Sequence, residues 1–183
     1  MWSTVGSTGT VDLADVGKVI FAGSIVQIPG VSSTGVRNAH RESGAASHEA
    51  VVFPLTTARI RYDVTPDAGV NRFLLTLKLL FRGGSGQVVA KLVQVAIPQV
   101  GVYEVPEPAV TETTLLTFDS AAQDPSGEFQ AREVTFLPTD PGKLDFTNNA
   151  YYIELSLIAR EGPVVLINPP AVATIQLFEA EHQ

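Results

Sequence analysis

The chain has 183 residues, no cysteine, a net charge of −7 and a pI of about 4.9. The lack of cysteine excludes disulfides, thiolate catalysis and cysteine-ligated zinc, and the acidic balance argues against a nucleic-acid partner, because duplex binding depends on clustered Lys and Arg. No apolar run approaches the roughly 20 residues that a membrane-spanning helix requires.

Short strands, with no convincing helix, follow one another along the chain. Runs rich in Val, Ile, Thr, Phe and Tyr alternate with Gly, Pro, Asn and Asp, a pattern typical of all-β domains. Eight to ten strands joined by short connections predict an all-β, two-sheet antiparallel β-sandwich of jelly-roll type. In chain order the expected strands are 17–28, 49–53, 58–65, 72–81, 87–97, 113–119, 129–136, 150–159 and 171–178, with 163–167 as a further edge piece.

Two segments rich in small polar residues flank the first expected strand. Residues 1–16 are expected to form a flexible N-terminal arm, and residues 17–183 a single β-sandwich domain. Residues 30–50 are expected to be a surface loop or a segment that becomes ordered against a neighbour. The start of the chain lacks the basic and apolar regions of a signal peptide, so an extracellular location would require that a leader has been removed, and the compartment stays open.

Alternation predicts which side chains of the central strands point inward. Along 58–65 the alternate residues Ile60, Tyr62 and Val64 share one face. The segment 72–81 shows the same alternation, and the turn-forming residues 66–71 suggest that these two strands are antiparallel neighbours. The glycine-rich 82–87 then predicts a hairpin turn; it lacks the Lys-Ser/Thr of a phosphate-binding loop.

Charge is unevenly distributed along the sequence. From Arg37 to Lys91 there are 8 basic and 4 acidic residues, giving +4, whereas from Leu92 to the end there are 3 basic and 13 acidic residues, giving −10. If the halves occupy different surfaces, copies of the protein could attract one another head to tail. If the fold interleaves the halves, the asymmetry averages out.

No catalytic constellation stands out, and the chain is expected not to be an enzyme. His40 and His48 share a Gly-, Ser- and Ala-rich segment with two glutamates, which is more typical of a solvated loop than of a metal site. Glu133 and Glu154 could in principle form a carboxylate pair for glycoside hydrolysis, but nothing in the sequence fixes their separation. A Gly-x-Ser-x-Gly nucleophile elbow is missing.

One cluster of oxygen-bearing side chains lies between residues 139 and 149. Asp140, Asp145, Asn148 and Asn149 are hard ligands of the kind that Ca²⁺ prefers. Their spacing does not match an EF-hand loop, and the same residues are ordinary turn formers. Calcium is therefore the one cofactor hypothesis, beside a plain turn and no cofactor.

The tyrosines are the candidates for sugar recognition. Tyr151 alternates with Ile153, Leu155 and Leu157 and is expected in the core. Tyr152 alternates with Glu154 and is expected to face outward or into a groove. Tyr152, with Glu154 beside it, and Tyr103 are therefore the expected ligand-binding residues.

The stretches "TTLLTFDS" (113–120) and "LDFTNNAYYIELSLIAR" (144–160) resemble those of bacterial jelly-roll sandwiches. That group includes carbohydrate-binding modules, which would imply a calcium ion and an aromatic cleft, and small structural β-proteins. The charged fraction is only 17%, against about 25% in typical domains, which suggests that some surface is neutral polar or is covered by another chain. We therefore expect a structural, self-associating homo-oligomer or larger assembly, with a carbohydrate-binding module as the alternative and a glycan as its partner.

Overall fold

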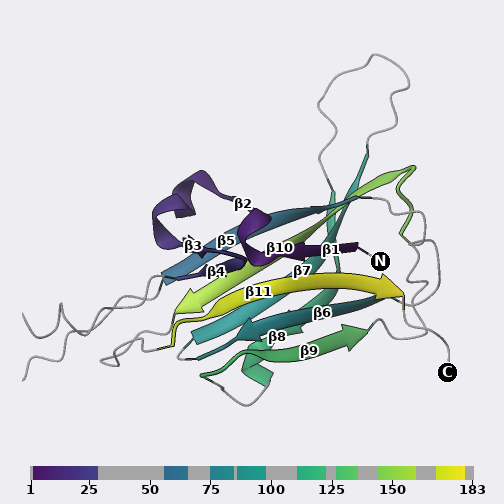
Figure 1. Cartoon of the computed structure of the whole chain (residues 1–183). Helices are drawn as coiled ribbons and strands as arrows, with labels where there is room; N and C mark the ends of the chain where they lie inside the picture. Colours follow the sequence, from purple (N-terminus) through teal and green to yellow (C-terminus); the bar gives the residue numbers. More distant parts are fainter. Residues whose placement is uncertain are drawn as a thin grey trace, which may run out of the picture.

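The computed structural model describes residues 2–28, 56–65, 75–84, 86–97, 111–122, 127–135, 144–159 and 168–179. These residues form eleven strands and three short 3-10 helices, and the strands build two antiparallel sheets (Figure 1). The all-β, two-sheet antiparallel sandwich is thus confirmed, whereas the jelly-roll type stays a prediction. In this part of the chain no helix is long and apolar enough to cross a membrane.

Sheet A has the strand order β3–β4–β11–β6–β9. β4 pairs with the start of β11, at Ala171 and Val172, and β1 pairs with the following residues 174–177 of β11. Its strands are β1 (Trp2–Val5), β3 (Ile20–Ala22), β4 (Ile25–Gln27), β6 (Leu75–Arg82), β9 (Gln130–Thr135) and β11 (Ala171–Glu179).

Sheet B has the order β2–β5–β10–β7–β8. Its strands are β2 (Thr10–Val11), β5 (Thr56–Val64), β7 (Gly86–Ala96), β8 (Glu112–Asp119) and β10 (Asn149–Ala159). The 3-10 helices are η1 (Gly6–Thr8), η2 (Leu13–Lys18) and η3 (Ser120–Ala122).

The core lies between the inner faces of the two sheets, where alternate side chains of each strand are withdrawn from solvent. The inward stripe predicted for 58–65 is confirmed, because Ile60, Tyr62 and Val64 are all buried. Tyr151, the first residue of the predicted inward stripe of β10, is buried too, as predicted. The fully buried large side chains are Phe81, Ile60, Leu77, Leu79, Leu92, Leu144, Ile153, Leu155, Leu157, Ile175 and Leu177.

The predicted pairing of 58–65 with 72–81 is wrong, because β5 belongs to sheet B and β6 to sheet A. The apolar faces of both strands line the same core, each from its own sheet. Alternation shows which face of a strand is buried, but an apolar stripe looks the same whichever sheet supplies it. The glycine-rich 82–87 is likewise not a hairpin. The Gly86 N–H donates to the Gly83 carbonyl at 3.0 Å, and the tight turn carries the chain from sheet A to sheet B.

The N-terminal segment lies within the sandwich, so its assignment as an arm outside the sandwich is wrong. β1 pairs with β11 of sheet A, and β2 pairs with β5 of sheet B. Close approach explains the glycines: a Cβ on Gly6 would lie 2.1 Å from the Val172 carbonyl oxygen, and one on Gly9 would lie 2.2 Å from Ile60 Cγ2. A composition that resembles a flexible linker is here required by packing.

The expected strand 17–28 is in fact the end of η2 followed by the β3–β4 hairpin. Ala22 pairs with Ile25 across a two-residue turn, and Gly23 takes a φ of 60° there, a conformation that favours glycine. These extra short elements raise the strand number above the predicted eight to ten. The expected pieces 49–53 and 163–167, and the segment 30–50, lie outside the described residues.

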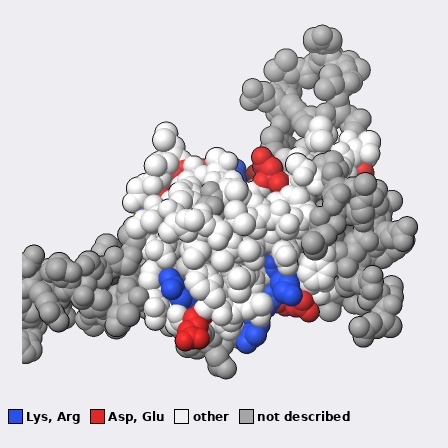
Figure 2. All heavy atoms as spheres, in the orientation of Figure 1, with Lys and Arg blue, Asp and Glu red and all other residues white. Residues whose placement is uncertain are grey.

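The described strands interleave the basic and acidic halves of the sequence. In sheet B, β10 lies between β5 and β7, so that Glu154 stands opposite both Arg61 and Lys91. In sheet A, Lys78 of β6 stands opposite Glu133 of β9 in the strand register. In the view of Figure 2 most of the described surface is uncharged, and charged side chains of both signs gather over β6 and β9. The described strands therefore favour charge averaging over a head-to-tail split.

Candidate functional site

Tyr152 lies on the outer face of sheet B, but its side chain is largely buried. It stands opposite Asp63 of β5 and Val93 of β7, and only 9% of it is exposed. The guanidinium carbon of Arg61 lies 5.0 Å from the centroid of its ring, a cation–π arrangement. Burial is the main reason why the pKa of Tyr152 is raised, and the nearby carboxylate of Glu112 adds to the effect. A sugar ring would have to displace Arg61 in order to stack on this side.

Glu154 lies beside Tyr152, two residues further along the same face. The nearest approach between Arg61 Nη2 and Glu154 Oε2 is 3.9 Å, and the side chains are 47% and 19% exposed, respectively. An ion pair this long and this exposed contributes at most about 1 kcal/mol. The structure thus brings Tyr152 and Glu154 together as expected and adds Arg61, whereas Tyr103 lies outside the described residues.

The sequence pattern did not identify Arg61 as a partner of Tyr152. Alternation predicts that Arg61 points outward from β5, but it does not show that β10 lies beside β5. Glu133, considered above as a catalytic partner of Glu154, lies in sheet A, while Glu154 lies in sheet B. Glu133 is exposed on the edge strand β9, and Glu154 points to the outer face of the opposite sheet. The core separates the two, so these two carboxylates do not form a pair.

The candidate calcium ligands 145–149 form a tight turn that leads into β10. Asp145 Oδ1 accepts the Thr147 N–H at 3.0 Å, and Asp145 Oδ2 accepts the Asn148 side-chain amide at 2.7 Å. The bond from Asn148 is the main reason why the pKa of Asp145 is lowered. This is the geometry of an Asx turn, in which the carboxylate holds the backbone of its own turn.

The remaining turn residue is also bonded inside the protein. Asn149 Oδ1 accepts the Gln94 side-chain amide at 2.8 Å, and the Asp145 N–H donates to the Tyr151 hydroxyl at 2.8 Å. Asp140 lies outside the described residues, and those described contain no group of three or more His, Cys, Asp or Glu side chains suited to a metal ion. The side chains of Asp145, Asn148 and Asn149 form hydrogen bonds within a structural turn, and the calcium site stays a prediction.

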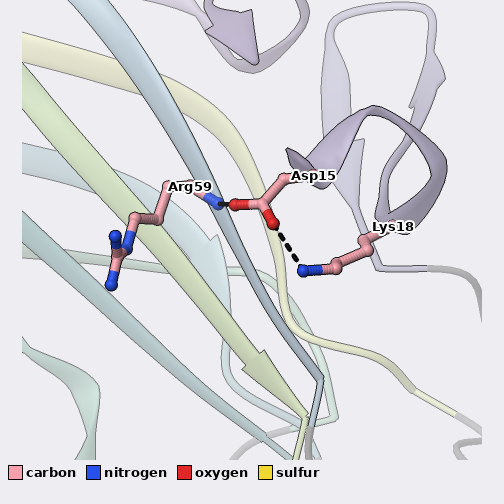
Figure 3. A network of polar contacts seen from close by, with 3 residues as sticks. All are labelled: Asp15, Lys18 and Arg59. Carbon is pink, nitrogen blue, oxygen red and sulfur yellow. Dashed lines mark hydrogen bonds and ion pairs between the residues drawn. The ribbon is translucent and has the colours of Figure 1, made fainter. Parts of the chain in front are cut away.

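Asp15 of η2 makes a contact that no sequence pattern indicated. Asp15 Oδ2 accepts the backbone N–H of Arg59 at 2.9 Å, and Asp15 Oδ1 accepts Lys18 Nζ at 2.6 Å (Figure 3). The side chain is only 10% exposed. The bond from Lys18 is the largest of the effects that lower the pKa of Asp15. Asp15 therefore fixes η2 to the edge of sheet B.

A second buried contact holds the N-terminal segment to the same strand. The hydroxyl of Tyr62 donates to the Gly6 carbonyl at 2.7 Å, and burial raises the pKa of this tyrosine. Trp2 packs against the core from β1. Together with Asp15, these contacts set the position of η2 and of β3, which follows it directly.

Exposed apolar side chains are grouped where η2 runs into β3. Leu13 and Val16 of η2 are 92% and 57% exposed, and Ile20 and Phe21 of β3 are 43% and 44% exposed. We call these four residues the η2–β3 surface. Figure 1 shows η2 and β3 at one corner of the sandwich. These four are among only six exposed large hydrophobic side chains in the described residues, so their grouping within nine positions is a feature of this corner.

Among the described strands β3 is also an edge of sheet A, and it differs from the other edges that the structure describes. A strand edge offers unpaired backbone groups to another chain, and proteins protect such edges with charges or covering segments. β9 carries exposed Arg132 and Glu133, β8 carries exposed Glu112, and β5 is covered by β2 and η2. β1 has half-buried or polar side chains only. All three residues of β3 are exposed and apolar.

Comparison with models of known protein families finds none that matches this chain, and comparison with curated proteins finds no significant match either.

Proposed function

We propose that this protein is a non-enzymatic, self-associating structural β-sandwich, and that two copies pair through the η2–β3 surface. The observation that carries the proposal is the uncharged, exposed β3 edge with Leu13 and Val16 beside it. Exposed apolar patches of this kind are typical of protein–protein contacts. Pairing would remove the four side chains from water and extend sheet A across both copies.

A second copy is the partner because the surface is compatible with itself. The stretch from Ile20 to Gln27 contains no charged residue, so two such edges meet without like-charge repulsion. Beside it, Lys18 is already paired with Asp15 at 2.6 Å. An antiparallel contact between two β3 strands is symmetric and closes into a pair without leaving a further open edge of the same kind.

The test is sedimentation equilibrium on the full chain and on single-lysine variants. We expect the wild type to self-associate and Leu13→Lys and Phe21→Lys each to weaken association by about tenfold or more, which corresponds to about 1.4 kcal/mol. Leu13 is almost fully exposed, so its replacement leaves folding intact, and thermal unfolding verifies this. Thr117→Lys, at an exposed position on β8, adds the same charge away from the surface and serves as the matched control.

Two results would contradict the proposal. One is a wild-type chain that stays monomeric at the highest soluble concentration. The other is a loss of association in Thr117→Lys as large as in Leu13→Lys, because the effect would then come from charge alone and not from the apolar surface.

A further inference from the structure

The hairpin of β3 and β4 determines which backbone groups of β3 face the outer edge. Ala22 and Ile25 flank a two-residue turn, and in such a turn the first and fourth residues are joined by backbone hydrogen bonds. Along an antiparallel ladder, hydrogen-bonded pairs alternate with pairs that are not hydrogen-bonded. The next pair, Phe21 with Val26, is therefore not hydrogen-bonded, and the backbone N–H and C=O of Phe21 point away from β4, toward the edge of sheet A.

Val19 extends this edge toward η2. It lies two positions before Phe21, so its backbone groups point to the same side. Its φ of −128° and ψ of 151° are those of an extended strand, and its side chain packs against the core. At the other end the extended backbone stops at Gly23, whose φ is 60°. The backbone groups that a further strand can bond are thus those of Val19 and Phe21.

We infer that two copies pair antiparallel about Ile20, with Val19 of each copy opposite the partner's Phe21. The inference rests on the proposed self-association and names the residues that meet in it. Val19 and the partner's Phe21 form a hydrogen-bonded pair on each side of the two-fold axis, and all of these residues have extended backbone. Ile20 stands opposite the partner's Ile20 as a pair without hydrogen bonds, the type in which side chains lie closer together.

The two neighbouring registers use this edge less well, although a symmetric contact can be centred on any of the three residues of β3. Centred on Phe21, the contact has one extended hydrogen-bonded pair, and its flanking pairs require Gly23. Centred on Ala22, every hydrogen-bonded pair requires Gly23. Because a φ of 60° departs from the strand conformation, bonds to that residue are poorly aligned. Only the register about Ile20 bonds extended residues throughout.

A second copy of this chain fits the edge at both ends. Ile20 and Phe21 are 43% and 44% exposed, and Val19 is half-buried, so every facing position sets an apolar side chain against an apolar one. The edge begins after η2 and ends at the hairpin turn, and a second copy has the same limits in reverse order, so neither strand overhangs the other. No described atom beyond the adjoining residues lies within 4 Å of the position that a Cβ would take at Gly23, which leaves room for the partner's η2 beside the turn.

Introduced cysteines test the register, because the chain itself contains none. Ile20→Cys, Phe21→Cys and Ala22→Cys each place a thiol at the centre of one of the three registers. In the pair about Ile20, the Cα atoms of the two residues at position 20 lie about 4.5 Å apart. Those at position 21 are diagonal neighbours, about 7–8 Å apart, and those at position 22 are further apart still. Disulfides do not form without backbone movement when the Cα atoms are more than about 7 Å apart.

The disulfide-linked fraction of each full-length variant is measured at equilibrium in a glutathione buffer, at a concentration at which the wild type associates. We expect the disulfide between copies to be favoured in Ile20→Cys over Phe21→Cys and Ala22→Cys by about tenfold or more, because a strained disulfide is more easily reduced. Thr117→Cys, at an exposed position on β8, is the matched control for disulfides that form through random collisions.

Hydrogen exchange on the wild type gives a second reading that needs no substitution. On association, the amides of Val19 and Phe21 should both exchange more slowly, because each donates to the partner. A pair centred on Ala22 would protect Phe21 and leave Val19 unchanged.

The register is overturned if the favoured disulfide forms in Phe21→Cys or Ala22→Cys, or if Val19 gains no protection while the chain associates. A disulfide in Ile20→Cys no more stable than in Thr117→Cys would also overturn it, since the copies would then meet elsewhere. The proposed function fails separately, in sedimentation of the wild type and of Leu13→Lys. Leu13→Lys combined with Ile20→Cys should lower the disulfide-linked fraction, and an unchanged fraction would show that the disulfide forms without the η2–β3 surface and would count against the inferred pair.

Discussion

Asp15 and Arg59 are 44 positions apart, yet a carboxylate oxygen of the first accepts the backbone N–H of the second at 2.9 Å. This bond joins the 3-10 helix η2 to β5, a strand of sheet B that begins 38 positions after the end of η2 at Lys18. It makes residues 12–18 a covering element of sheet B and determines where the apolar side chains of the same segment stand.

The first prediction concerns pH. The Lys18 bond, followed by the Arg59 N–H bond, outweighs burial and lowers the pKa of Asp15 from its ordinary value of 3.8. Between the folded and the unfolded pKa of Asp15, the folded state therefore binds fewer protons than the unfolded chain. The stabilisation by the Asp15 carboxylate is full above the unfolded pKa, about pH 4, and is lost as the pH falls through the folded pKa. We expect Asp15→Asn to lower the free energy of unfolding by about 1–2 kcal/mol at pH 7.

Chemical denaturation at a series of pH values measures this effect. The gap between the wild type and Asp15→Asn should narrow in acid, while Asp12→Asn, the matched control, follows the wild type more closely. A gap that stays constant down to the acid limit would show that Asp15 does not stabilise the fold through its charge.

The second prediction concerns Tyr62, whose hydroxyl bonds the Gly6 carbonyl at 2.7 Å. Tyr62→Phe keeps the ring in the core but leaves that carbonyl without this donor. We expect a loss of about 1–3 kcal/mol in the free energy of unfolding, together with faster hydrogen exchange in β1 and β2. Unaltered stability would mean that water replaces the hydroxyl at no cost.

The third prediction tests the in–out alternation of β6. Leu79 is fully buried between the sheets, whereas its neighbour Leu80 is half-buried on the outer face of sheet A. We expect Leu79→Ala to cost about 2–5 kcal/mol, because it leaves a cavity, and Leu80→Ala to cost less than half as much. Equal losses in urea denaturation would contradict the assignment of faces.

Much of the sandwich could be predicted from the sequence because alternation is a local property. The stripe from Tyr151 to Leu157, and that of Ile60, Tyr62 and Val64, follow from the two-residue period of a strand. Which strands pair is a long-range property: β5 and β6 are adjacent in sequence, but they lie in different sheets, and β10 stands between β5 and β7. No local pattern distinguishes these arrangements.

The same difference between local and long-range properties applies to the candidate site. The outward position of Tyr152 and Glu154 was predicted correctly, but the burial of Tyr152 depends on Arg61 and other neighbours from distant strands. The contact between Asp15 and β5 could not be foreseen either, because its acceptor lies in a segment that resembles a linker. Glycine there signals close packing only when the opposing strand is known.

The fourth prediction separates packing from ligand binding at Tyr152. Since the side chain is only 9% exposed and Arg61 covers its ring, we expect Tyr152→Ala to lower the free energy of unfolding by about 2–4 kcal/mol. Glu154→Gln, on the same face, should cost less than about 1 kcal/mol. A stable Tyr152→Ala variant that loses binding to an immobilised glycan would instead support the carbohydrate-binding alternative.

The fifth prediction concerns salt. Each copy carries a net charge of −7, so copies repel one another at long range, while the η2–β3 surface offers apolar side chains to its partner. Screening shortens the reach of that repulsion to about 8–10 Å at 0.1–0.15 M ionic strength, and sulfate strengthens apolar burial. Association measured by sedimentation should therefore strengthen as sodium chloride is added, and more so with sodium sulfate. Head-to-tail attraction between oppositely charged surfaces predicts the reverse, so weakening with salt would show that charge complementarity, and not the apolar corner, joins the copies.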